Sequence, residues 1–357
     1  MTRGYFLFLT LTLIYLNSCK NSDKINIPET GSIMTTTQKD KKYEWLPTEC
    51  APEIYPVRIK EGYFIMEDGS SIEIPSGGRT VHNGWGQIGS TYIVGDDLKP
   101  IPRKLKITWI SYAENKFYSG DFDLPSEEIQ RFFEKGFLDR RNKQENYSRI
   151  VVGMAPGGIV SIWLLGAGST VEIGQYLAKE INMEINDLSP NTTLDRETYV
   201  ANRINSLKED KLKKLKEVGI RTDIWKTYRK RYSWKPVYNF NSQAEATKTL
   251  VDFFNGESIH TFSKNPLLTS FQEFAVPKYT RFYWMDKNKN EFGSKIYFDE
   301  KEMYETFDKI FANPKVKQAV LNFEVDKYNS NIKVFIESDV ERLELKKATI
   351  KVYEASN

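Results

Sequence analysis

Cysteine and histidine are scarce in this sequence. It contains two cysteines and two histidines in 357 residues. Two cysteines cannot make the multi-bridge framework of a small secreted domain, and Cys50, in the run Glu-Cys-Ala-Pro, is interpreted as an inert thiol. His82 and His260 lie far apart and have no ligand-like spacing to Cys, Asp or Glu. Because a catalytic zinc needs three protein ligands and a structural zinc four, this pattern argues against a histidine-based metal site.

Motifs for nucleophilic catalysis and phosphate binding are also missing. Residues 166–170 read Gly-Ala-Gly-Ser-Thr, which lacks the closing glycine of a nucleophile elbow and the third glycine of a dinucleotide loop. A Ser-His-Asp triad assembled in space stays open. The acid pairs Asp96-Asp97 and Glu127-Glu128 are interpreted as solvated surface groups, since adjacent side chains point apart or flank a helix cap. We therefore predict no catalytic residue, no cofactor and no metal.

The chain has no strong excess of charge. Its formal net charge is +3 at pH 7, which argues against nucleic acid as a partner. Beyond the first residues it has no apolar run of membrane length, although 40% of its residues are hydrophobic. These features predict a body with a substantial core outside the bilayer.

The N-terminus has the pattern of a secretory signal. A short segment with Arg3 precedes an apolar run over residues 5–16, and Leu16-Asn-Ser-Cys19 follows. Twelve helical residues span about 18 Å, against a hydrocarbon core of about 30 Å, so a transmembrane anchor is not expected. The Leu-x-Ser-Cys run resembles a lipobox. The resemblance implies a signal peptide over residues 1–18 and lipidation of Cys19.

A lipid anchor at Cys19 would place the body at a bacterial membrane. Lys20 follows the cysteine where an inner-membrane retention signal would have Asp, so we predict the outer membrane, with the periplasmic face and the cell surface both open. Residues 19–42 are polar and lack apolar periodicity, which predicts a flexible tether. As a coil it would average about 25–30 Å end to end.

A weak duplication organises the rest of the chain. Residues 104–133 and 279–307 both read as an apolar hairpin followed by a helix, and an apolar hairpin and closing strands come after each. The matching residues are Trp109 with Trp284, Phe117 with Phe292, Ile129 with Met303, and Phe133 with Phe307. We predict an α+β fold of two related β-β-α-β-β-β units with antiparallel sheets, over residues 43–186 and 279–357. Ser126 and Asp299 are the expected helix N-caps.

Between the two units we predict a helical, basic-aromatic insert over residues 187–278. Asp195 can cap a helix that continues to about Val218, and apolar spacing predicts a second helix over residues 243–254. Before both units, residues 57–74 indicate a hairpin that turns at Asp68-Gly69.

Two segments are candidate binding elements. The first is a glycine-rich loop, residues 77–86, which we call the glycine loop; its candidates are His82, Asn83, Gly84, Trp85 and Gly86. Glycines allow close backbone approach, and Trp85 could stack on a sugar or insert into a partner; the alternative is a tight connection whose tryptophan covers the edge of a core. The second is a basic-aromatic segment, residues 211–235, with a local charge of +8. It could bind an anionic partner, or it could be a solvated helix face. Its candidates are Trp225, Tyr228, Arg229, Lys230, Arg231, Tyr232 and Trp234.

Several segments in one order resemble a known family of bacterial lipoproteins. They are His82-Asn-Gly-Trp-Gly86, Leu105-Lys-Ile-Thr-Trp109, Gly120-x-Phe-x-Leu-Pro125, Pro156-Gly-Gly158 and Val171-Glu-Ile-Gly174. Over roughly residues 55–185 the chain is similar to the domain of unknown function 2931. That family has no established activity, so the resemblance transfers no catalytic residue. It implies an envelope lipoprotein, sometimes found beside secreted-toxin systems.

Three classes of function follow from these patterns. The first is a non-enzymatic envelope lipoprotein that binds a protein or glycan, in a specific form an immunity protein against an envelope-targeting toxin. The second is a carboxylate-dependent cell-wall or glycan hydrolase with its acids on the side of the glycine loop. The third is a structural component of the envelope. We favour the first.

Overall fold

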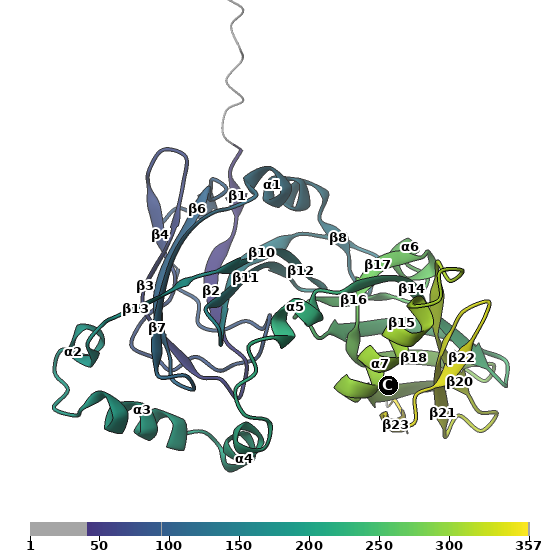
Figure 1. Ribbon diagram of the computed structural model, residues 1–357. Coiled ribbons are helices and arrows are strands. Elements are labelled where there is room, and N and C mark those ends of the chain that lie inside the picture. Colours follow the sequence, from purple (N-terminus) through teal and green to yellow (C-terminus); the bar gives the residue numbers. More distant parts are fainter. Residues whose placement is uncertain (1–40, 94, 356–357) are drawn as a thin grey trace, which may run out of the picture. The chain divides into compact units, whose positions relative to one another are not determined.

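The computed structural model describes residues 41–355 with the exception of residue 94. The predicted signal peptide, Cys19 and the predicted tether up to residue 40 lie outside the described residues. The body is built mainly of strands, with a few helices (Figure 1). This confirms the predicted α+β class. We refer to residues 41–181 as the N-terminal half and to residues 231–355 as the C-terminal half.

One nine-stranded sheet runs through both halves in the order β2-β10-β11-β12-β16-β15-β18-β19-β23. Its pairs are antiparallel except for β2 with β10. The halves meet where β12 pairs with β16, through Ser169↔Ile259 and Thr170↔Ser258. The strands are β2 Leu46–Cys50, β10 Tyr147–Ala155, β11 Ile159–Gly166, β12 Ser169–Leu177, β16 Ser258–Phe262, β15 Ala244–Phe253, β18 Pro277–Asp286, β19 Glu291–Tyr297 and β23 Thr349–Glu354.

Each half adds a second, five-stranded sheet. In the N-terminal half its order is β13-β7-β6-β3-β4, with β3 Val57–Ile65, β4 Ser71–Glu73, β6 Lys104–Ser111, β7 Lys116–Asp123 and β13 Lys179–Ile181. In the C-terminal half it is β17-β14-β20-β21-β22, with β14 Arg231–Phe240, β17 Gln272–Ala275, β20 Ala319–Val325, β21 Ile332–Glu337 and β22 Arg342–Glu344. Two short pairs complete the strands, β1 Tyr43–Glu44 with β5 Leu98–Lys99 and β8 Phe137–Leu138 with β9 Gln144–Glu145.

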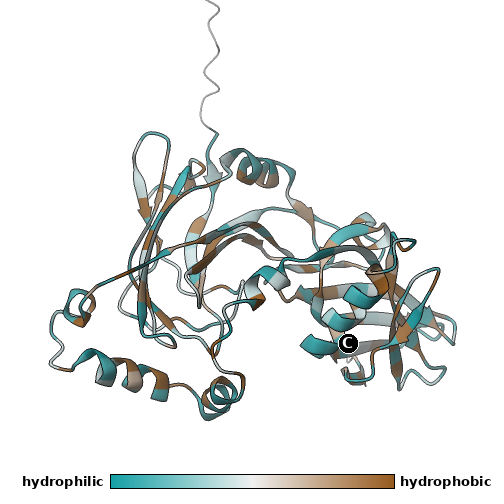
Figure 2. Cartoon of the chain, viewed as in Figure 1, coloured by the Kyte–Doolittle hydropathy of each residue, from teal (hydrophilic) through white to brown (hydrophobic). Residues whose placement is uncertain are grey.

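The core of each half lies between its two sheets, because strands with period two in burial present one apolar face each. In the N-terminal half Trp109 and Ile107 of β6 share a cluster with Val152 of β10. In the C-terminal half Trp284 of β18 shares one with Phe323 of β20. Figure 2 shows apolar (brown) and polar (teal) residues interspersed along these strands.

The helices are α1 Ser126–Lys135, α2 Ile185–Leu188, α3 Arg196–Asn205, α4 Glu209–Val218, α5 Ile224–Tyr228, α6 Pro266–Thr269 and α7 Glu300–Phe311. Helix α1 buries Ile129 and Phe133, and α7 buries Met303 and Phe307, as the matched positions in the sequence predict. In residues 41–355 no helix is long and apolar enough to cross a membrane.

The predicted caps are confirmed at two helices and wrong at one. The Asp299 carboxylate accepts a hydrogen bond from Glu302 N at 2.9 Å, and Asp195 accepts one from Thr198 N at 2.8 Å. Ser126 is the first residue of α1 rather than its cap, and its hydroxyl donates instead to the Pro102 carbonyl at 2.7 Å.

The predicted helix over residues 243–254 is wrong, because this segment is strand β15. Its burial follows period two at Thr249, Val251 and Phe253. The spacing of Ala246, Leu250 and Phe253 fits a helical stripe, but the β-branched residues between them favour a strand, and strands β16 and β18 pair with it on its two sides. The predicted helical insert, residues 187–278, therefore holds helices as far as Tyr228, and strands follow from Arg231 with only the four-residue helix α6 among them.

The predicted helix over residues 195–218 is two helices, α3 and α4. The Ser206 hydroxyl donates to the Arg203 carbonyl at 2.7 Å and so competes with continuation of the helix, while Leu207 turns into the interior. An uninterrupted amphipathic helix to Val218 would turn this residue inward, but Val218 is exposed. The hairpin over residues 57–74 is confirmed as β3 and β4, with Gly69 in its turn at a φ of +81°.

Candidate functional site

The glycine loop packs against the turn between β15 and β16 in the C-terminal half. Gly86 has a φ of +72°, and a Cβ added to it would lie 2.3 Å from the Gly256 carbonyl oxygen. Only glycine therefore allows the two backbones to approach this closely. Gly84 N donates to the Ala51 carbonyl at 2.9 Å, and the Asn83 amide donates to Gln87 O at 3.1 Å.

Trp85 is directed into the protein rather than into solvent, and only 8% of it is exposed. Its ring centroid lies 4.8 Å from that of Trp163 on β11 and 4.9 Å from that of Trp225 on α5. The structure thus brings together one tryptophan from each predicted binding element, as neighbours in a small buried cluster that also contains Cys50. His82, in the same glycine loop as Trp85, is half-buried.

The aromatic residues of the basic-aromatic segment are also turned inward. Trp225 and Trp234 are buried. Tyr228 stacks on Phe254 with ring centroids 5.5 Å apart, and Tyr232 lies 5.1 Å from Phe307 of α7. These rings belong to the core and its edge, so they do not form the exposed stacking surface that the sequence suggested.

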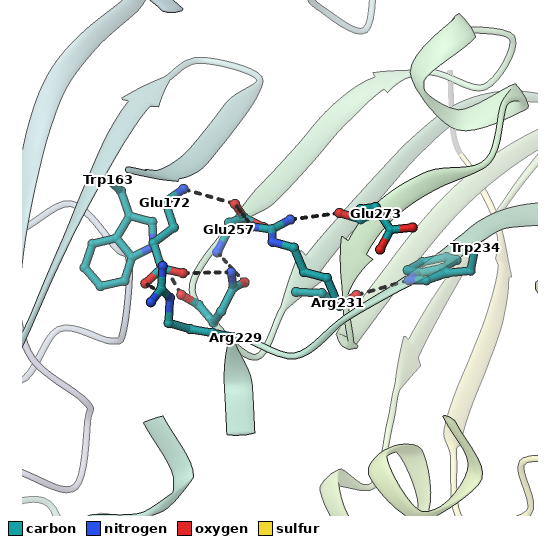
Figure 3. A network of polar contacts seen from close by, with 9 residues as sticks. Trp163, Glu172, Arg229, Arg231, Trp234, Glu257 and Glu273 are labelled. Carbon is teal, nitrogen blue, oxygen red and sulfur yellow. Dashed lines mark hydrogen bonds and ion pairs between the residues drawn. The ribbon is translucent and has the colours of Figure 1, made fainter. Parts of the chain in front are cut away.

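Six of the ten cations of the same segment are paired with acids, among them the three at positions 229–231. Arg229 Nε lies 3.2 Å from Glu172 Oε1 on β12, and an Arg231 Nη2 hydrogen bond of 2.6 Å reaches Glu257 Oε1 just before β16. Lys230 Nζ lies 2.9 Å from an oxygen of Asp308 on α7. Figure 3 shows the two arginines approaching Glu172 and Glu257 from the segment that joins α5 to β14.

The two arginines, Glu172, Glu257 and Asn255 form one connected set of polar contacts, which we call the junction network. Backbone and amide groups complete it. Glu172 N donates to Glu257 Oε1 at 3.1 Å, and the Asn255 amide donates to Glu172 Oε2 at 3.3 Å. Trp163 Nε1 donates to the Asn255 carbonyl at 3.1 Å, and Arg231 Nη1 to the Glu273 carbonyl at 3.0 Å (Figure 3). The network ties β12 of one half to the start of β14 and β16 of the other.

The junction network perturbs one of its carboxyl groups strongly. Burial raises the pKa of Glu172 to about 7; the Arg229 charge opposes this rise and the Glu257 charge adds to it. The Glu172 and Glu257 side chains are 3% and 8% exposed. Such buried acids need their charge-assisted hydrogen bonds, because an unpaired buried carboxylate would cost several kcal/mol.

A groove of about 880 Å³ adjoins the junction network. Its walls come from both halves: the end of α1 and the β8–β9 hairpin on one side, and β16, α6 and β17 on the other. Phe132, Phe137 and Leu267 give it apolar surface, and Arg231 and Glu257 of the network line it as well. Apolar walls with a few convergent polar groups are typical of binding sites.

Other candidate sites are weaker. A shallower hollow of about 820 Å³ lies over β13, β7, β6 and β3, where Lys106 and Asp121 form an exposed ion pair. Within the described part of the chain no three or more His, Cys, Asp or Glu side chains gather closely enough to hold a metal ion. Burial lowers the pKa of His260, with nearby arginines adding to the effect.

Residues 32–223 match the family described as Protein of unknown function (DUF2931). The chain belongs to this family. The predicted resemblance is therefore confirmed, and the match extends it from both ends. No curated protein and no solved structure matches the chain. The DUF2931 match ends just before α5, so β14 to β23, and with them one wall of the groove, lie beyond it.

The groove and the acids of the junction network were missed at the sequence level. Glu172 stands between Val171 and Ile173 in an apolar strand, and Glu257 follows Gly256 at a turn. Two features of the sequence could have indicated a buried ion-pair network. Glu172 is enclosed by apolar residues, and Arg229 and Arg231 are two positions apart. The partner acids lie 57 and 26 residues from their arginines, so spacing alone could not match them.

Proposed function

We propose that this DUF2931 protein is a non-enzymatic, lipid-anchored protein of the outer membrane that binds a protein partner in the groove between its halves. The single observation behind the proposal is the groove itself. It offers about 880 Å³ of partly apolar space, enough for several side chains of a partner. Leu267 at its rim is 40% exposed and offers apolar surface that a bound partner would cover.

An extended segment of the partner fits the groove best. Gln272, Glu273 and Phe274 of β17 line it, and β17 is the outermost strand of its sheet. An edge strand has unpaired backbone donors and acceptors on its outer side, and an added strand can bind them while its side chains enter a neighbouring pocket. A glycan would use the aromatic faces, and here the large rings nearby are mostly turned into the core.

The place where the chain enters the body is consistent with a membrane-tethered binder. Lys41, the first described residue, has its Nζ 2.7 Å from Glu134 of α1, and Tyr43 also donates to Glu134, at 3.1 Å. The next residue of α1, Lys135, lines the groove. The lipobox at Cys19 supports the anchor, and in a specific form of the proposal the partner is an envelope-targeting toxin that the protein neutralises.

A hydrolase is the alternative, and one observation favours it. A carboxyl group whose pKa is raised to about 7, as at Glu172, can act as a general acid near neutral pH. Yet Glu172 is buried and ion-paired, and of the two network acids only Glu257 lines the groove. Loss of cell-wall or glycan hydrolysis in Glu257→Gln, from a protein that shows such activity, would establish the alternative.

We also propose that the two halves arose by duplication of a unit larger than β-β-α-β-β-β. In each half an early strand pairs in parallel with a strand that follows the helix: β2 with β10 in the N-terminal half, and β14 with β20 in the C-terminal half. The strand that follows it pairs with the first strand of the hairpin: β3 with β6, and β15 with β18. A late strand pairs with the second strand of the hairpin: β13 with β7, and β23 with β19. This shared order supports the proposal and places the groove beside the contact between the two copies.

Site-specific photo-crosslinking in the source cells tests the binding proposal. A photoreactive phenylalanine analogue at Leu267 should give a discrete cross-linked product, whereas the same probe at Tyr328, which is 73% exposed on the β20–β21 turn, should not. Ser270→Trp, which fills the groove from an exposed position, should remove the product at Leu267. Equal products at both positions, or a product insensitive to Ser270→Trp, would contradict binding in the groove.

The anchor is tested separately, so that its failure is distinguishable from a failure of binding. Labelling with a radioactive fatty acid should mark the wild-type protein and not Cys19→Ala. If both proteins stay unlabelled while cross-linking at Leu267 persists, the groove is supported and the lipid anchor is wrong.

A further inference from the structure

Two arginines converge on one tyrosine at a place remote in sequence from the groove. Arg58, near the start of β3, donates from Nη1 to the Tyr199 hydroxyl at 2.5 Å. Arg203, one turn beyond Tyr199 on α3, donates from Nη2 to the same oxygen at 3.2 Å, and its guanidinium lies 4.9 Å from the centre of the Tyr199 ring. A second donor of Arg58, Nη2, reaches the Leu188 carbonyl at 3.1 Å.

The positive charge of this pair is not neutralised. Among residues 41–355 neither guanidinium has a carboxylate oxygen within 4.0 Å, in contrast to Arg229 and Arg231 of the junction network. A phenol is a neutral acceptor and cannot balance two cations. The pKa of Tyr199 accordingly lies below its ordinary value: burial raises it, but the Arg203 hydrogen bond and the Arg58 charge together outweigh burial.

Hydrogen-bond donors at the same place have no acceptor. Tyr112, immediately after β6, is 1% exposed, and its hydroxyl makes no hydrogen bond within 3.5 Å among the described residues; its interaction with the Tyr199 hydroxyl contributes to the pKa shifts of both groups. Its ring centroid lies 6.3 Å from that of Tyr199. Arg58 Nε is also buried without a partner. Buried polar groups are nearly always hydrogen-bonded, so the unpartnered Arg58 Nε and the poorly paired Tyr112 hydroxyl, beside two unbalanced cations, indicate a site for an acceptor that carries negative charge.

The local structure holds these groups in place. Arg58 lies opposite Ile110 in the β3–β6 pair, and Tyr112 N is fixed by the Pro56 carbonyl at 3.1 Å. Helix α3 packs Tyr199 into the small apolar cluster that also contains Tyr112. The glycine loop borders the site, because a Cβ on Gly78 would lie 3.5 Å from Arg58 Nη2.

We propose that Arg58, Arg203, Tyr199 and Tyr112 form a binding site for a phosphate monoester. Guanidinium groups bind phosphate oxygens with two parallel hydrogen bonds, and a monoester near neutral pH carries a charge close to −2, which matches two unbalanced arginines. The two tyrosine hydroxyls turn to donate to the remaining oxygens. The ligand is either a soluble phosphomonoester or the headgroup of a lipid such as phosphatidic acid. This site is separate from the groove and does not depend on the function proposed for it.

Calorimetric titration of the detergent-purified protein tests this site. The probes are inorganic phosphate, glycerol 3-phosphate, and mixed micelles that contain short-chain phosphatidic acid, each at pH 7.5 and low ionic strength. We expect saturable binding that weakens with salt and weakens again at pH 5, where the monoester loses its second charge. Binding to glycerol 3-phosphate as tight as to the lipid identifies a soluble ligand; tight binding to the phosphatidic acid micelles alone identifies a headgroup.

Variants separate this site from a general effect of charge. Arg58→Gln and Arg203→Gln should each weaken binding at least tenfold, whereas Lys213→Gln, on an exposed side chain of α4, should leave it unchanged. Tyr112→Phe should weaken binding about tenfold and change the Tm little, since the hydroxyl it removes makes no hydrogen bond within 3.5 Å in the unliganded protein. No saturable heat with any probe in natively folded protein would overturn the proposal, as would affinities that the Arg58, Arg203 and Tyr112 variants leave unchanged.

Discussion

Replacing Glu172 by glutamine tests the electrostatics of the junction network. The amide keeps the shape of the side chain and an acceptor for Asn255, but it cannot ionise. In the folded protein burial raises the pKa of Glu172 from its ordinary value of 4.5 to about 7. One pKa unit corresponds to about 1.36 kcal/mol, so ionising this side chain in the folded protein costs about 3 kcal/mol more than in the unfolded chain.

The sign of the pH dependence follows from proton binding. Below pH 4.5 both states hold the proton, and Glu172 makes no difference between them. Between pH 4.5 and about 7 the folded state keeps the proton and the unfolded state releases it, so the free energy of unfolding falls as the pH rises. Above this window the wild-type protein carries the full penalty, and Glu172→Gln does not.

We therefore expect Glu172→Gln to unfold at about the same urea concentration as the wild type at about pH 4, below the window, and to be more stable at pH 8 by up to about 3 kcal/mol. Glu305→Gln, on the exposed face of α7, is the control for the loss of one charge. A stability difference that does not change with pH would refute the reasoning. If the variant were less stable at pH 8, the Arg229 ion pair would outweigh the cost of burial.

Three further perturbations probe packing and reactivity. Phe307→Ala should lower the free energy of unfolding by about 3–5 kcal/mol in urea titrations, since this ring of α7 is fully buried; a loss below about 1 kcal/mol would contradict the burial. Gly86→Ala should lower the Tm and speed hydrogen exchange in β16, because its Cβ would collide with the Gly256 carbonyl at 2.3 Å, and unchanged exchange would place the loop elsewhere. Cys50 should resist a thiol reagent in the folded Cys19→Ala protein and react fully in urea, since burial raises the pKa of its thiol to about 12; rapid labelling of the folded state would count against this.

Local features of the fold were predictable from the sequence because they depend on neighbouring residues. The hairpin that turns at Gly69 and the N-caps Asp195 and Asp299 are formed within a few positions. The membership of the DUF2931 family likewise follows from motifs in one order along the chain. Period two in apolar residues correctly indicated most strands between residues 104 and 173.

Strand β15 shows where such reasoning stops. Its residues fit both a helical stripe and a strand, and the choice depends on β16 and β18, which pair with it on both sides. Strand β14 pairs in parallel with β20, for example Trp234 with Ala319. The two strands are far apart in the sequence, so no local turn predicts this pairing. Backbone groups buried between two neighbours must all be satisfied, so the sheet overrides local preference.

The basic-aromatic segment shows the same difference between local sequence and tertiary contacts for the predicted binding residues. From the sequence alone it is a run of cations and aromatic rings, and composition determines its charge but not its surroundings. In the folded protein Trp225 meets Trp85, Tyr232 meets Phe307, and Arg231 meets Glu257. A side chain is exposed or buried according to which distant segment covers it, and only the tertiary structure decides that. The sequence by itself determined the chain's family, its strand-rich character and the predicted anchor at Cys19; the contact between the two halves decided where a groove and its charges could lie.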